Sequence, residues 1–428
     1  MRRFFLAAVI ACLCLHPCAL CAQADGGADP EVEIRPPGSY YAKRAALFPL
    51  ELPAYAFKVA LFPISEGMAL MERKRVFERT AEFLSNKEHT MWVYPIINWG
   101  AGDNFGGGAG FKHRDLFGEQ YVLGASYTIN ISLTQHAEAS LARDEVFSLW
   151  DRPVSFWTGI EWDRVTNADY YGKGSDTPRD DHSRYEIDDI RWEGQLRMGL
   201  GHGVEIGASL GLMSALTGPS TYGGYPSVET TFGAASLPGY DRWLTHLKFG
   251  LGVGHSTLDD RRRPRRGGLQ KLALAWNQCL NSRQLSYGAL TFDAEHYFPM
   301  WKLGHVFVAR YNMVLEQAFG GDQVPFYRLA VLDYRSPLRG FKRGRFRDTS
   351  SMLFNFEYLF PVSRMVEGIV FADTGRVFDG LSDFSFDSWK YSAGGGMNLK
   401  LFRITLLKFR AAYGGEGVNL MLGMTMSI

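Results

Sequence analysis

The last eleven residues, Val418-Asn-Leu-Met-Leu-Gly-Met-Thr-Met-Ser-Ile428, alternate between two kinds of side chain. The even-numbered positions hold Val, Leu, Leu, Met, Met and Ile, and the odd-numbered positions hold Asn, Met, Gly, Thr and Ser. Successive side chains of a strand point to opposite faces, so one face of this segment suits lipid and the other suits an aqueous lumen. The segment is therefore predicted to be the last strand of a membrane β-barrel.

The same alternation recurs from residue 90 onward. It predicts fifteen further strands, at 91–98, 104–112, 121–132, 134–142, 153–163, 190–200, 203–213, 243–254, 270–278, 285–298, 305–315, 352–360, 365–373, 390–400 and 402–413. Residues 90–428 thus provide roughly 21 residues per strand and connection, and a tilted membrane strand uses about 9–11 of them. The predicted fold is all-β: a sixteen-stranded antiparallel transmembrane β-barrel.

An even number of strands places both ends of the barrel on the periplasmic side. The long polar stretches 164–184, 214–240 and 317–350 follow odd-numbered strands and are therefore expected to be external loops. A soluble β-sandwich or propeller would also alternate. It would not explain strands of this length, aromatic residues at segment ends and an export signal together.

The N-terminus carries the features of that signal. Two arginines precede the apolar run Phe4–Leu15, and small residues follow, which predicts a secretory signal peptide at 1–24. About 12 apolar residues are too few to span a membrane. Residues 25–89 are expected to form a Pro-rich periplasmic lead-in with an amphipathic helix at about 65–85. That helix would either lie on the membrane, dock on the barrel or pack as an ordinary helix.

Composition excludes several classes of protein. The chain is 46% hydrophobic and 14% aromatic, which argues against disorder, and its net charge of +1 argues against nucleic-acid binding. Four of the five cysteines lie in the predicted signal, and the ten histidines show no metal-ligand spacing. The G-x-S-x-G pattern at 207–211 lies inside an alternating strand, where no nucleophile elbow forms. We expect no catalytic residue, cofactor or metal.

Three motifs lie near the end of the chain. The stretch 317–350 contains Leu338-Arg339-Gly340-Phe341 and then Gly344-Arg345-Phe346-Arg347-Asp348. Two strands follow, Asn355-Phe-Glu357-Tyr-Leu-Phe360-Pro361 and Phe371-Ala-Asp373-Thr-Gly375. At period 2, Phe371, Asp373 and Gly375 share one face. If that face is the lumen, Asp373 can pair with Arg339, whose planar guanidinium suits a carboxylate.

These motifs resemble the outer-membrane assembly barrels of the BamA/TamA type, the bacterial surface antigen superfamily. The resemblance implies an R-G-F loop that folds into the lumen, where Arg339 locks it to the wall at Asp373. It also implies bacterial outer-membrane localisation, contact with membrane lipids and unfolded outer-membrane or secreted proteins as clients. The family's periplasmic POTRA modules need about 70–80 residues each, so the chain resembles a POTRA-less branch.

The implied function is insertion or translocation of proteins, or transfer of lipid, through a lateral seam between the first and last strands. Pro95, Gly423 and Ile428 belong to that seam. Because proline lacks an N–H, Pro95 either weakens the seam or lies at the periplasmic rim. The basic turn Arg261–Arg266 would contact lipid headgroups or be solvated. A passive diffusion channel with the same barrel is the alternative function.

Overall fold

A computed structural model describes residues 85–100, 103–220, 222–261, 263–300, 304–332, 338–363, 365–401 and 404–424. The predicted signal peptide, the Pro-rich lead-in up to residue 84, most of the expected helix at 65–85, and Ile428 lie outside these residues. Within the described ranges, no helix is both long and apolar enough to cross a membrane.

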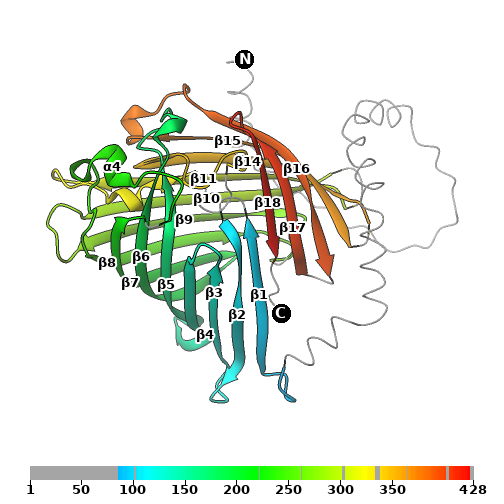
Figure 1. Ribbon diagram of the computed structural model, residues 1–428. Helices are drawn as coiled ribbons and strands as arrows, with labels where there is room; N and C mark the ends of the chain where they lie inside the picture. Colours follow the sequence, from blue (N-terminus) through cyan, green and yellow to red (C-terminus); the bar gives the residue numbers. More distant parts are fainter. Residues whose placement is uncertain are drawn as a thin grey trace, which may run out of the picture. The chain divides into compact units, whose positions relative to one another are not determined.

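Sixteen antiparallel strands form the main sheet, and the predicted fold is confirmed (Figure 1). The strands are β1 Met91–Gly100, β2 Asp103–Leu116, β3 Tyr121–Asn130, β4 Gln135–Leu149, β5 Arg152–Tyr170, β6 Ser183–Gly201, β7 Val204–Pro219, β8 Leu244–Ser256, β9 Gly267–Cys279, β10 Tyr287–Pro299, β11 Val306–Ala318, β14 Ser350–Pro361, β15 Val366–Phe378, β16 Lys390–Leu401, β17 Ile404–Tyr413 and β18 Val418–Met424.

Each strand pairs with its neighbours in sequence, and β11 pairs directly with β14. The ring is completed by β1 and β18, which lie side by side in blue and red in Figure 1. In the described part of these two strands, the seam consists of Asn98 opposite Gly423 and Trp99 opposite Leu422. On its other side, β18 pairs with β17 along its whole described length, from Leu407–Met424 to Tyr413–Val418.

The outer surface of the barrel is apolar, as a lipid-facing surface must be. In β9, Leu272, Leu274 and Trp276 alternate along the strand and leave 37%, 52% and 39% of their surfaces exposed. Asn277, at an intervening position of the same strand, is only 4% exposed and lies on the lumen side. The period-2 pattern of the sequence therefore separates a lipid face from a lumen face.

Two strands are much longer than predicted. β5 and β6 each have 19 residues, and their ladder continues to Tyr170 opposite Ser183. The stretch 164–184, expected to be a loop, is therefore partly strand, and the connection is only 171–182. The sequence signal ended early because outward side chains need be apolar only within lipid, whereas backbone pairing continues beyond it.

Short elements occupy the external connections. They are η1 Arg179–Asp181, α4 Val228–Phe232, η2 Ala234–Ser236, η3 Phe326–Arg328, η4 Leu381–Asp383 and the two-stranded sheet of β12 Ala330–Val331 with β13 Arg347–Asp348. Tyr170, Tyr185, Val228, Leu237 and Phe326 form one buried cluster. The external loops therefore pack on the β11–β14 connection rather than standing free in solvent.

Candidate functional site

The connection between β11 and β14, residues 319–349, is here called the lumen loop. Its apolar side chains Leu338, Phe341 and Phe346 are buried against Leu353 of β14 and Val377 of β15. Both strands contribute lumen-facing positions to this contact, so the loop packs on the inner wall of the barrel. Each of its three buried side chains is less than 9% exposed, and burial of such groups contributes about 1.5–3 kcal/mol each.

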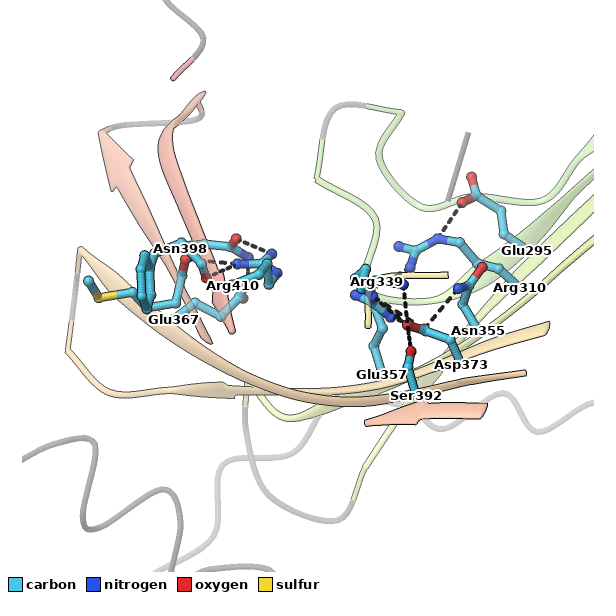
Figure 2. Close-up of polar contacts among 12 residues, drawn as sticks. Glu295, Arg310, Arg339, Asn355, Glu357, Glu367, Asp373, Ser392, Asn398 and Arg410 are labelled. Carbon is cyan, nitrogen blue, oxygen red and sulfur yellow. Dashed lines mark hydrogen bonds and ion pairs between the residues drawn. The ribbon is translucent and has the colours of Figure 1, made fainter. Parts of the chain in front are cut away.

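Arg339 lies at the centre of this contact (Figure 2). Its Nε donates to the Asp373 carboxylate at 3.0 Å, its Nη2 donates to the other oxygen, and its backbone N–H donates at 3.2 Å. The guanidinium also lies over the Phe371 ring, 3.6 Å from the centroid. Asn355 and Ser392 complete the shell of Asp373, donating at 2.8 and 2.9 Å. The structure thus brings together the two residues that the motifs singled out.

The network extends further along the wall than the motifs predicted. Arg339 Nη1 donates to Glu357 Oε1 at 2.6 Å, and the other oxygen of Glu357 lies 2.6 Å from Arg310 Nη1. Arg310 in turn donates to Glu295 at 3.3 Å. Acidic and basic groups therefore alternate from β10 through β11 and β14 to β15, and each buried charge has an opposite neighbour. This continuity ties the lumen loop to four consecutive wall strands.

At both glycines of the loop motif, the structure disfavours a residue with a side chain. Gly344 has φ +70°, a conformation that favours glycine. Gly340 does not have a positive φ, but a Cβ there would lie 2.5 Å from the backbone nitrogen of Gly414. Gly375 is similarly restricted, because a Cβ would lie 2.9 Å from the Met352 carbonyl oxygen.

The remaining motif residues lie in the outer part of the lumen loop or on the wall. Arg347 donates to the Asp169 carbonyl at 2.8 Å, and Asp348 pairs with Lys173 at 3.3 Å. Both contacts join the lumen loop to the β5–β6 hairpin. Pro361 lies at the end of β14 opposite Glu367, away from the loop.

A second polar cluster lies apart from Arg339, near the start of β15 (Figure 2). Glu367 of β15 accepts from Asn398 at 3.0 Å, forms an ion pair with Lys400 and lies 2.7 Å from Arg265 Nη2. Arg265 belongs to the β8–β9 turn, so this turn reaches across to β15. The expectation of a solvated basic turn is therefore wrong for Arg265, although Arg261 remains exposed.

The β8–β9 turn is also held by an apolar contact and by its own hydrogen bonds. Leu258 packs against the lumen-facing cluster that includes Ile369 and Phe371. The backbone N–H groups of Arg265 and Arg266 donate to the Asp259 carboxylate, which lowers its pKa below the usual range. The turn is thus a preformed unit that contacts the inner wall near the start of β15.

We expect Glu367→Gln to lower barrel stability by on the order of 3 kcal/mol, because it leaves the buried Lys400 and the half-buried Arg265 without their carboxylate. Urea unfolding in detergent micelles would measure this. The matched control is Glu295→Gln, because Arg310 there retains Glu357 as a partner. Equal unfolding midpoints for the two variants would contradict the assignment of Glu367 as the anchor of the turn.

The rest of the lumen holds a cavity of about 1420 Å³ between the wall and the lumen loop. Its charges are largely paired, as Lys248 with Glu193 at 3.0 Å and Arg328 with Asp189 at 2.6 Å. His136, Glu161 and Asp163 also converge there at distances that could hold a metal ion. Arg191 already contacts both carboxylates, at 3.1 Å from Glu161, so a guanidinium offsets part of their negative charge.

Pro95 lies inside β1, opposite Ala109 of β2, rather than below the paired region. The Arg114 N–H donates to the Thr90 carbonyl at 2.8 Å, which sets the alternation of this antiparallel ladder. By that alternation the nitrogen of Pro95 points away from β2, toward the seam. Pro95 therefore offers no hydrogen-bond donor on the side of β1 that faces away from β2. Gly423 lies at the seam itself, opposite Asn98.

Several site residues were missed by the sequence analysis. Arg310 lies in the apolar strand 305–315, in phase with Asn312, and this isolated charge was a usable signal. Ser392 and Glu367 had no comparable signal, because small and acidic residues are common in loops and strand ends alike. Arg265 was hidden among neighbouring arginines. Its partner lies 102 residues away.

Comparisons with known proteins agree with this architecture. The pattern of the Omp85 superfamily domain matches residues 116–416. No curated protein matches the chain in a direct sequence comparison. Among solved structures, BamA from Haemophilus ducreyi lacking POTRA domains 1-3 is similar, with TM-score 0.60 and 15% identity over 78% of this chain and 69% of that chain.

Two further structures share the fold. CdiB from Acinetobacter baumannii has TM-score 0.53 and 10% identity over 78% of this chain and 60% of that chain. CdiB from Escherichia coli has TM-score 0.51 and 12% identity over 78% of this chain and 62% of that chain. The domain match spans most of the barrel, including the lumen loop and its wall. This chain belongs to the Omp85 superfamily and is a β-barrel protein of the bacterial outer membrane.

Proposed function

We propose that the barrel assists the insertion or translocation of client proteins at the outer membrane through the seam between β1 and β18. The observation that carries the proposal is the seam itself, where Asn98–Gly423 and Trp99–Leu422 are the pairs in the described residues. Pro95 offers no hydrogen-bond donor on this side. A strand edge that lacks a ladder donor can exchange its partner for a client strand at lower cost than a fully bonded edge.

The occupied lumen supports a lateral route over a passive channel. The lumen loop packs on the wall through Arg339 and a buried apolar cluster, and the β8–β9 turn contacts the opposite end. These elements reduce the cross-section available for free diffusion. A passive diffusion channel is the second candidate, because a cavity of about 1420 Å³ with paired charges remains beside the loop.

Cross-linking the seam tests the proposal. We expect Asn98→Cys combined with Gly423→Cys to form a disulfide and to stop insertion of an unfolded eight-stranded barrel protein into proteoliposomes. Reductant should restore the activity, because only the seam is constrained. The control pair is Ala109→Cys with Tyr127→Cys, opposite positions on β2 and β3 away from the seam. Full insertion by the oxidised Asn98/Gly423 variant would contradict the lateral route.

A further inference from the structure

The lumen loop contacts the β17–β18 hairpin, whose strand β18 forms one side of the seam, as well as the wall. Asn419, on the last strand β18, donates through Nδ2 to two carbonyl oxygens of the loop motif. The acceptors are Arg339 O at 3.0 Å and Phe341 O at 2.9 Å. Val418 and Leu420, on either side, point outward and are 72% and 57% exposed. The lumen-facing side-chain amide of Asn419 is therefore bonded to the loop that carries Arg339.

The β17–β18 turn makes two further contacts with the same loop. Gly340 and Gly414 approach so closely that neither has room for a side chain: a Cβ on Gly414 would lie 2.6 Å from the Phe341 ring. Arg345, itself 5% exposed, binds the Glu416 carboxylate with Nη2 at 2.9 Å and Nε at 3.0 Å. Backbone contact, hydrogen bonds and a charged pair thus join the loop to the hairpin whose outer strand forms the seam.

We infer that Asn419 is a positioning residue through which the lumen loop controls the seam. While Arg339 holds the loop on Asp373, the loop's carbonyl groups hold β18 in place opposite β1. Release of the loop removes these acceptors, and β18 then depends on its pairs with β17 and with β1 alone. Coupling of this kind is reciprocal, so opening the seam must also loosen the loop. The biological meaning of this control rests on the proposed function, but the coupling itself does not.

The experiment measures seam opening in the purified barrel without any client. A single cysteine at Gly423→Cys reports opening through its rate of alkylation by a water-soluble maleimide. We expect Asn419→Asp, which keeps the size but cannot donate to a carbonyl, to raise that rate at least several-fold. Arg339→Ala should raise it as well, although Arg339 does not touch Gly423. Asn312→Asp is the matched control, because it changes a lumen-facing amide of β11 that bonds Asp293, away from the loop motif.

The second part of the experiment tests whether closing the seam also restrains the lumen loop. With Lys342→Cys as the reporter on the lumen loop, the Asn98–Gly423 disulfide should slow alkylation, and Asn419→Asp should abolish this protection. An alkylation rate at Gly423→Cys that is equal in Asn419→Asp and Asn312→Asp would overturn the coupling. If the rate rises while client insertion is unchanged, the coupling stands and the proposed function fails. If the rate is unchanged while seam cross-linking still blocks insertion, the coupling alone fails.

Discussion

Arg339→Ala is expected to release the lumen loop and to raise the conductance of the barrel in planar bilayers. The substitution removes three hydrogen bonds to Asp373, the bond to Glu357 and the stacking on Phe371. Two buried carboxylates then lack their shared cation. Loss of one partner of a buried pair costs about 3–5 kcal/mol, so the variant should also unfold at lower urea concentration.

The Arg339→Lys variant tests the positive charge at this position separately from the planar geometry of the guanidinium. An ammonium keeps the positive charge but cannot serve both carboxylates with a planar fork, so it should recover stability only in part. Arg310→Lys is the control, because its contacts lie on the wall rather than on the loop. A steady conductance that is the same in wild type and Arg339→Ala would refute the lumen lock and favour the passive channel.

Gly340→Ala is the second large expected effect, and it leaves every charge in place. The new Cβ would lie 2.5 Å from Gly414 N and 2.6 Å from Ser392 Cβ. Backbone atoms on the barrel wall cannot move far, so the tip of the lumen loop must shift and Arg339 must move with it. We expect raised conductance and a loss of stability of about 1–3 kcal/mol, as for other overpacked sites.

Gly218→Ala provides the matched control for this variant. It also lies in the barrel, near the end of β7, but a Cβ there has no neighbour within 4 Å. Its conductance and unfolding should match those of the wild type. If Gly340→Ala behaves like Gly218→Ala, the loop tip is not held against the β17–β18 turn, and the steric part of the lock is wrong.

The sequence predicted the barrel well where lipid imposes a pattern. Each of the sixteen expected strands has a counterpart, because every membrane-spanning segment must alternate. The predictions failed where the strands extend beyond the lipid, as in β5 after Asp163 and in β6 before Ile190. They also failed where a turn folds inward, as at Arg265. In those places, register and the opposite wall decide which groups meet.

The sequence by itself determined the lipid face, the strand number and the pair of motifs containing Arg339 and Asp373. These features follow from period 2 and from the residue types of a loop and one strand. Only the tertiary structure decided that Glu357 and Arg310 extend this pair and that Asn419 connects the loop to the seam. The physical reason is that closure of the barrel brings β18 beside β1 and sets which lumen-facing side chains the loop can reach. Local spacing along the sequence determines neither of these arrangements.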